Sequence, residues 1–278
     1  MNHEGWMARA IKLARRGLYT TDPNPRVGCV LVREDRLVAE GWHRKAGEPH
    51  AERVALANAG EQARGATAYV TLEPCCHHGR TPPCSDALIA AGVERVVVAM
   101  LDPNPLVAGQ GIAQLREAGI EVITGVLESS AAALNPGFIK RMSQNMPYVR
   151  CKLAMSLDGR TAMADGESKW ISSDASRRDV HRLRARSSAI LTGSGTVLAD
   201  NPSMTVRLPT DALYGVERDE DMRQPLRVVL DTHLALSPDA AILKQPGETL
   251  VVTTSDDGAL ADALMATGAT LLRQDHSD

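Results

Sequence analysis

At 278 residues, the chain exceeds one average domain of about 100–200 residues, so two domains are expected. Its 44% hydrophobic and 23% charged residues are typical of a globular protein, and no apolar run approaches the ~18 residues that a membrane span needs. A net charge of -3 and only 3% aromatic residues disfavour a nucleic-acid partner, because nucleic-acid-binding proteins usually combine a basic surplus with aromatic platforms for the bases.

The first half of the chain alternates predicted helices and strands. Apolar residues at helical spacing, followed by Gly17, predict a helix over residues 5–16. The remaining elements follow from short β-branched or apolar runs and from the amphipathic runs between them. Strands are predicted at 27–32, 37–40, 66–72, 95–100 and 120–124, and helices at 50–59, 86–91, 111–118 and within 126–146. This alternation predicts an α/β domain with a mixed sheet over residues 1–145.

The second half, residues 146–278, begins with a predicted strand over 148–156. A helix over 173–184 is rich in basic residues, which is usually the mark of a solvated face. A strand at 189–192 leads into Gly193-Ser194-Gly195 and a helix, and such a turn is suited to a phosphate, although a plain loop is an equal alternative. The remaining prediction comprises strands at 226–231, 249–253 and 270–272 and a helix at 259–267.

Three zinc-ligand side chains and one further carboxylate stand out in the first half. They lie in His50-Ala51-Glu52, in Pro74-Cys75 and at Cys84. A catalytic zinc typically has three protein ligands and leaves one position for water. In nucleobase deaminases, this pattern supplies the ligands and a glutamate that moves protons. Because His50 and Glu52 share one helical turn, Glu52 cannot easily bind the same ion, and we expect it to carry protons.

A closed structural zinc site is the alternative interpretation. Structural sites are four-coordinate, and Cys76, His77 or His78 would supply the fourth ligand. Catalysis is favoured because a structural site needs neither Glu52 nor the proline that precedes Cys75.

Two loops are candidates for substrate contact. Eight residues separate Cys75 from Cys84, where the common deaminase spacing has two, and Arg80 in this insert is suited to a phosphate. The run Pro23-Asn24-Pro25 predicts a rigid loop whose Asn24 amide donates and accepts hydrogen bonds at a substrate ring, although it is also ordinary turn chemistry. His43 is interpreted as an ordinary surface or internally satisfied histidine.

The cysteine usage points to a reducing compartment. Five cysteines form an odd set, and the amino terminus lacks a charged start followed by an apolar run of secretory length. Disulfides are rare in reducing compartments. A cytoplasmic location is therefore expected.

Five runs of the sequence together match a pattern shared by a known family, and they lie at 21–29, 47–52, 71–84, 102–105 and 152–161. On these runs the sequence resembles the bifunctional deaminase/reductase family of riboflavin biosynthesis. The resemblance implies a cytidine-deaminase-like three-layer domain followed by a dihydrofolate-reductase-like α/β domain. It implies zinc-dependent deamination of 2,5-diamino-6-(5-phosphoribosylamino)pyrimidin-4-one, and then reduction of the ribose to a ribityl chain by NADPH. His50, Cys75 and Cys84 correspond to the zinc ligands of the family and Glu52 to its proton donor.

The resemblance also implies two sets of binding residues in the second half. The residues that would contact NADPH are Ala154, Trp170, Thr196 and Asp200. Those that would hold the ribosylamino-phosphate are Ser168, Arg184, Met204 and Arg207. The two arginines are physically suited to a phosphate, whereas Met204 is equally suited to core packing.

The family pattern continues past the last residue of this sequence, so an incomplete reductase domain is expected. A deaminase with a non-functional reductase remnant is therefore an alternative, as are a nucleoside or tRNA deaminase and a non-catalytic zinc-binding module. The low aromatic content and the long insert argue against tRNA. A homodimer is expected, because family members assemble and an incomplete domain leaves apolar edges.

Overall fold

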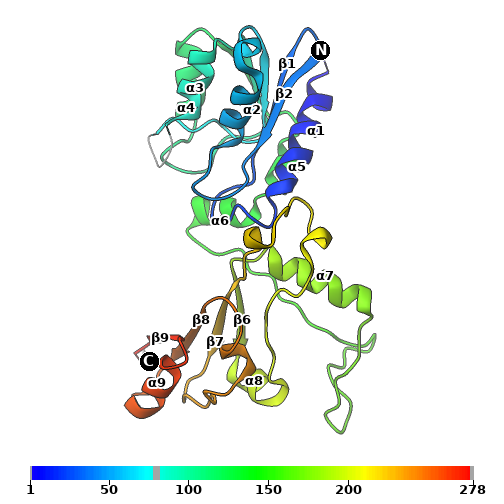
Figure 1. The fold of residues 1–278 in the computed structure, drawn as a ribbon, viewed down its shortest axis with the longest axis vertical. Coiled ribbons are helices and arrows are strands. Elements are labelled where there is room, and N and C mark those ends of the chain that lie inside the picture. Colours follow the sequence, from blue (N-terminus) through cyan, green and yellow to red (C-terminus); the bar gives the residue numbers. More distant parts are fainter. Residues whose placement is uncertain (1, 78–81, 276–278) are drawn as a thin grey trace. The chain divides into compact units, whose positions relative to one another are not determined.

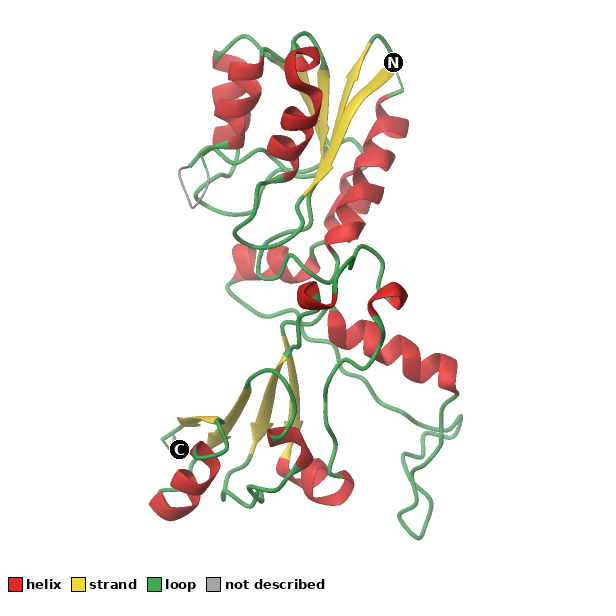
Figure 2. Cartoon of the chain, in the orientation of Figure 1, coloured by secondary structure: helices red, strands yellow, loops and turns green. Residues whose placement is uncertain are grey.

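The computed structural model describes residues 2–77 and 82–275, which form two compact units (Figure 1). The first unit comprises Met1–Cys151 with Tyr214–Glu217, and the second comprises Lys152–Leu213 with Arg218–Asp278. Each unit has its own sheet (Figure 2). The expected domain boundary, between residues 145 and 146, falls just after the last helix of the first unit.

The sheet of the first unit is mixed, and its strand order is β2-β1-β3-β4-β5. Its strands are β1 (Gly28–Arg33), β2 (Arg36–Trp42), β3 (Thr67–Val70), β4 (Arg95–Val98) and β5 (Glu121–Thr124). Strand β1 runs antiparallel to β2 and β3, whereas β3, β4 and β5 are parallel to one another. Each of the five strands was predicted from its apolar run.

Helices cover both faces of this sheet. One face carries α1 (His3–Ala14), α5 (Glu128–Ala132) and α6 (Pro136–Gln144), and the other carries α2 (Ala51–Ala59), α3 (Cys84–Ala91) and α4 (Gln110–Glu117) (Figure 1). Successive side chains of a strand point to opposite faces of the sheet. Val30 of β1 therefore packs in the hydrophobic cluster beneath α1, α5 and α6, and Leu31 packs in the cluster beneath α2, α3 and α4. The predicted three-layer α/β arrangement is confirmed.

Two glycines allow helices to touch the bare backbone of the sheet. A Cβ atom on Gly28 of β1 would lie 2.1 Å from the carbonyl oxygen of Ala10 in α1. A Cβ atom on Gly41 of β2 would lie 2.4 Å from the carbonyl oxygen of Ala51 in α2. Any other residue at either position would push the helix away. The distance between the sheet and the first turn of α2, which carries Glu52, therefore depends on Gly41.

The second unit has a parallel sheet with the order β6-β7-β8-β9. Its strands are β6 (Ala189–Gly193), β7 (Leu226–Leu230), β8 (Thr249–Thr253) and β9 (Thr270–Arg273), and its helices are α7 (Asp174–Ala185), α8 (Ser194–Asp200) and α9 (Gly258–Met265). Short 3-10 turns lie at Arg15–Gly17 and Gly60–Ala63 in the first unit and at Thr210–Ala212, Asp219–Asp221 and Ala241–Leu243 in the second. Across residues 2–77 and 82–275, no helix is long and apolar enough to cross a bilayer.

One predicted element of the second half is wrong, because residues 148–156 form no strand. Their alternating apolar side chains suggested a half-buried strand, but Val149 is 76% exposed and Leu153 is 63% exposed. A strand is stabilised by the hydrogen-bond ladder of a partner and by burial of one face. Residues 148–156 have neither, since they belong to neither sheet, β2-β1-β3-β4-β5 or β6-β7-β8-β9.

Candidate active site

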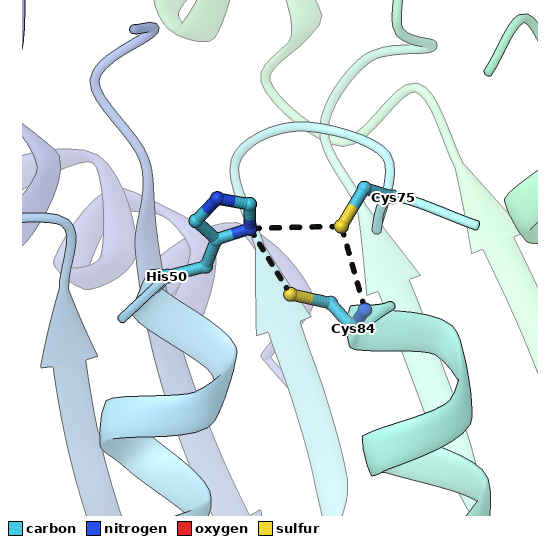
Figure 3. A group of neighbouring side chains, drawn as sticks. All are labelled: His50, Cys75 and Cys84. Atoms are coloured by element: carbon cyan, nitrogen blue, oxygen red, sulfur yellow. Dashed lines mark hydrogen bonds between the residues drawn. The ribbon is translucent and has the colours of Figure 1, made fainter. Parts of the chain in front are cut away.

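Three predicted metal ligands come together in the first unit. The donor atoms of His50, Cys75 and Cys84 all lie within 4.8 Å of one another. His50 is the N-cap residue of α2 and Cys84 is the first residue of α3, while Cys75 lies in the loop after β3 (Figure 3). The Nδ1 atom of His50 is 3.6 Å from the sulfur of Cys75 and 3.3 Å from that of Cys84.

This donor set fits zinc. Nitrogen and sulfur ligands placed tetrahedrally around zinc lie about 3.5 Å apart, given Zn–N near 2.0 Å and Zn–S near 2.3 Å. A hydrogen bond between the two thiols lowers the pKa of Cys75 and raises the pKa of Cys84. A bound divalent cation would displace the protons of both thiols.

The carboxylate of Glu52 lies beside this group without belonging to it. Glu52 is only 3% exposed and, with His50 and Cys75, lines the same cavity. Burial raises the pKa of Glu52 to about 7. A carboxyl group with such a pKa releases and accepts protons with similar ease near neutral pH.

The cavity has a volume of about 550 Å³ and is lined only by residues of the first unit. Among its lining side chains are Asn24 and His43, whose Nδ2 and Nε2 atoms are 3.1 Å apart. The Nδ1 atom of His43 lies 3.1 Å from the carbonyl oxygen of Pro49, so Nδ1 carries the proton and Nε2 accepts from Asn24. Burial lowers the pKa of His43, which keeps this ring neutral. His43 is internally satisfied, as the sequence suggested, but it also forms part of the cavity wall.

A second buried carboxylate, Glu73, binds the backbone of the segment from Asp102 to Ile112. Glu73 is 3% exposed and accepts hydrogen bonds from the backbone N–H groups of Asp102 at 3.1 Å, Gly109 at 3.0 Å and Ile112 at 3.2 Å. Asp102 lines the cavity, and burial raises its pKa to about 6. Neither carboxylate was predicted from the sequence to have a role.

The described residues offer no fourth ligand for a closed metal site, because the group of His, Cys, Asp and Glu donors in them has three members. Cys76 is outside the group, and its thiol faces the carbonyl oxygen of Leu106 at 3.8 Å. His77 lines the cavity. His78 and Arg80, the remaining candidates in the insert, lie outside the described residues.

Three residues expected to hold the ribosylamino-phosphate gather in the second unit. Arg184, from α7, donates to the carbonyl oxygen of Thr205 at 3.0 Å and lies 4.0 Å from the sulfur of Met204. Arg207 lies 3.5 Å from the Thr205 hydroxyl, and burial, together with Arg207, lowers the pKa of Arg184. His181 accepts a hydrogen bond from the backbone N–H of Arg207 at 3.2 Å. The basic residues of the helix that carries Arg184 were predicted to form a solvated face, but Arg184 itself is partly buried.

The other residues expected in the reductase site lie on different parts of the second unit. Ser168 and the expected NADPH contacts Ala154 and Trp170 lie between α6 and α7, where there is neither helix nor strand. Trp170 is 72% exposed, and the guanidinium of Arg177 lies 4.2 Å from the centre of its ring. The remaining NADPH contacts, Thr196 and Asp200, are exposed residues of α8.

Two family models match the chain, one for each unit. Residues 1–100 match the cytidine and deoxycytidylate deaminase zinc-binding region, and residues 147–266 match the RibD C-terminal domain. The first match includes all three residues of the metal group.

Full-length relatives match both halves together. The chain is 58% identical to the riboflavin biosynthesis protein RibD of Escherichia coli over 92% of this chain and 71% of the relative. It is also 58% identical to RibD of Haemophilus influenzae, over 84% of this chain and 63% of that relative. It thus spans roughly two thirds of the length of these proteins.

Solved structures agree with this match. RibD of Acinetobacter baumannii superposes with a TM-score of 0.90 at 53% identity, covering 98% of this chain and 74% of that one. A diaminohydroxyphosphoribosylaminopyrimidine deaminase/5-amino-6-(5-phosphoribosylamino)uracil reductase of Thermotoga maritima superposes with a TM-score of 0.82 at 39% identity, covering 98% and 80%. By these matches over both units, the chain belongs to the RibD family of riboflavin biosynthesis proteins.

Proposed function

We propose that the first unit catalyses the hydrolytic deamination of 2,5-diamino-6-(5-phosphoribosylamino)pyrimidin-4-one. His50, Cys75 and Cys84 hold the zinc ion, and Glu52 carries protons. The observation that carries this proposal is the buried carboxyl of Glu52, which lines one cavity with two of the three metal ligands. The Thermotoga maritima relative, named for this deaminase activity, supports it.

The reaction replaces a ring C–NH₂ group by a carbonyl group and releases ammonia, with water as the source of oxygen. Bound zinc would supply a water molecule whose pKa is lowered to about 7. Glu52 carries the two protons of water in turn. The first passes to the ring nitrogen as the water oxygen adds to the carbon, and the second passes from the resulting hydroxyl group to the amine, so that the carbon–nitrogen bond breaks with neutral ammonia as the leaving group. Because Glu52 is buried, bulk solvent does not compete for this proton.

The same cavity orients the pyrimidine. Asn24 uses its Nδ2 group to donate to His43, which leaves its carbonyl oxygen to accept from a ring N–H or amino group. Since the neutral ring of His43 is fixed by Pro49, the orientation of the Asn24 amide is fixed as well. Asn24 is therefore the residue of the first unit that binds the substrate ring.

The second unit reduces the ribose of the deaminated product with NADPH. Arg184, Met204 and Arg207, together with Ser168, hold the ribosylamino-phosphate; Ala154, Trp170, Thr196 and Asp200 contact NADPH. In support, neither Arg184 nor Arg207 forms an ion pair with a carboxylate within residues 2–77 and 82–275. Two neighbouring guanidinium groups without an acidic partner suit a phosphate dianion.

Substitution of Glu52 tests the deaminase. Glu52→Gln keeps the shape of the side chain but removes its proton chemistry, so we expect ammonia release to fall at least ~100-fold while bound zinc stays at its original stoichiometry. Glu61→Gln, an exposed glutamate of the 3-10 turn after α2, is the matched control. Unchanged turnover in Glu52→Gln would rule out its proton role. Preferred turnover of cytidine or tRNA by the unmodified chain would favour the alternative deaminases.

NADPH binding tests the reductase. A fluorescence titration with NADPH should saturate, and NADPH oxidation should follow addition of the deaminated product. A chain that deaminates but binds no NADPH would be a deaminase with a non-functional reductase remnant.

The remaining proposals concern assembly and location. We infer a homodimer, which light scattering of the purified chain would detect as twice the mass of 29.8 kDa. We also infer a cytoplasmic location, because none of the five cysteines, all of which lie in the described residues, forms a disulfide. Fractionation of cells that produce the protein checks the second inference.

A further inference from the structure

The side-chain amide of Asn135 is joined to the backbone of a residue far away in the sequence. The backbone N–H of Arg26 donates to Oδ1 of Asn135 at 2.8 Å, and Nδ2 of Asn135 donates to the carbonyl oxygen of Arg26 at 3.0 Å. The two residues are 109 positions apart, and Asn135 is only 2% exposed. A primary amide offers one donor side and one acceptor side, so Asn135 pairs with Arg26 as a neighbouring strand would.

This use of the amide is unusual for the position that Asn135 occupies. Asn135 is the N-cap residue of α6, where an asparagine ordinarily accepts a hydrogen bond from the first turn of its own helix. Its side chain makes no such capping bond, and Pro136 at the first helical position has no N–H group to satisfy. The amide is therefore directed away from its own helix and toward Arg26.

The two elements that Asn135 joins are two walls of the deaminase cavity. On one side, Arg26 directly follows Pro23-Asn24-Pro25, all of which line the cavity. Pro25 lies between Asn24 and Arg26, and the ring of a proline fixes its backbone angle φ. A displacement of Arg26 is therefore passed on to Asn24. On the other side, α6 contributes Phe138, Arg141 and Met142 to the lining.

We propose that Asn135 is a positioning residue for deamination, which holds the Asn24 loop and α6 at the separation that the substrate requires. Asn135 does not line the cavity itself, and it acts through the residues that do. The proposal rests on the deaminase function proposed above. It predicts an effect on substrate affinity more than on the proton chemistry of Glu52, because the zinc ligands belong to α2, α3 and the loop after β3.

The test compares three variants of the full chain. Asn135→Ala leaves the Arg26 N–H and carbonyl groups without their partner, and we expect KM for the pyrimidine substrate to rise roughly tenfold. We expect kcat to change less than about threefold, with zinc content unchanged. Asn58→Ala is the matched control, since it also removes an amide bonded to a backbone carbonyl, that of Glu40, but on the exposed side of α2.

Asn135→Asp separates positioning from simple helix capping. Aspartate is as good an N-cap residue as asparagine, so a role limited to starting α6 would survive this change. Aspartate accepts from the Arg26 N–H but cannot donate to the Arg26 carbonyl group, so we expect a raised KM here too. A KM equal to that of the unmodified chain in Asn135→Asp would overturn the proposal.

Hydrogen exchange follows the link without relying on catalysis. Peptides that contain Arg26 should exchange faster in Asn135→Ala than in the unmodified chain, whereas peptides from β3 and β4 should not. Unchanged exchange around Arg26, or faster exchange with unchanged KM, would overturn the positioning role. If the unmodified chain released no ammonia, the deaminase assignment would fail first, and this outcome is visible before any variant is made.

Discussion

The two units place their expected site residues on very different supports. In the first unit, the three expected zinc ligands and Glu52 lie at or beside helix termini, and hydrophobic clusters fill both faces of the sheet beneath them. Among the described residues of the second unit, one hydrophobic cluster forms the core, and several expected contacts lie in residues 152–173, which contain neither helix nor strand.

This difference bears on how each site comes to be formed. Packing against two layers fixes the helix ends in the first unit, so the donor atoms of His50, Cys75 and Cys84 already lie at zinc-like distances. Ala154 and Trp170 lie outside any helix or strand, and the guanidinium of Arg177 lies 4.2 Å from the centre of the Trp170 ring. The expected deaminase residues are therefore positioned by regular elements, whereas several expected reductase residues are not.

Metal removal is the strongest way to break this comparison. Incubation with a chelator should abolish ammonia release, by about 1000-fold or more, because the water is no longer activated. NADPH binding should be unchanged, since the expected NADPH contacts all lie in the second unit. Parallel ammonia assays and NADPH titrations on one sample check this. An equal loss of both activities would show that the two sites depend on each other.

Glu73→Gln tests whether buried polar contacts support the first site. The amide nitrogen of glutamine would meet a backbone N–H group in place of an acceptor, so we expect the free energy of unfolding of the first unit to fall by about 2–4 kcal/mol. Calorimetry measures this change. The control is Glu121→Gln, which removes a half-exposed ion pair with Arg95 and should change the free energy of unfolding far less, because solvent screens exposed pairs. Equal effects of both variants would contradict the supporting role of Glu73.

Arg207→Ala sharpens the comparison from the side of the second unit. Loss of one guanidinium should raise KM of the reductase step by about tenfold, through weaker phosphate binding. The deaminase step should be unaffected. Arg178→Ala, an exposed arginine of α7, is the control and should leave both steps unchanged. Steady-state kinetics of each step provide the measurement, and equal effects of the two variants would remove Arg207 from the phosphate site.

Trp170→Ala should have the smallest effect on stability. Because Trp170 is 72% exposed, we expect the free energy of unfolding to change by less than about 0.5 kcal/mol, while the affinity for NADPH falls. Trp170→Phe, which keeps a ring for Arg177, should bind NADPH better than the alanine variant. A large loss of stability in Trp170→Ala would mean that residues 145–173 are better supported than their exposure indicates.

The sheets of both units could be predicted because their signal is local. Strands such as β1 present apolar side chains to both faces, and the helices between them have amphipathic spacing. The metal group was likewise predicted, since its residue types and spacing form a motif. The predicted strand at 148–156 is wrong because alternating apolar side chains show that a segment is able to form a strand, and not that a partner strand is present.

The polar supports of the site could not be predicted in the same way. Glu73 binds backbone groups at Asp102, Gly109 and Ile112. Asn135 binds the backbone of Arg26, which lies 109 positions away in the sequence. Such bonds join a side chain to backbone that any residue could provide, so the sequence holds no pattern for them. His43 was predicted to be satisfied, but its place in the cavity depends on the meeting of β2 with the Asn24 loop.

The bare backbone at Gly41 has a consequence for how this enzyme can evolve. Ala51 and Ala55 of α2 approach so closely that a side chain at residue 41 would displace the helix that carries Glu52. Adaptation to a new substrate is thus not open to substitutions at residue 41, in the sheet beneath α2. It remains open to the loops around Asn24 and Asp102 and to α6, where a side chain could change without moving the helix that carries Glu52. Drift in a family with this architecture should accumulate at the rim of the cavity, while a residue with no functional group at all stays fixed beneath it.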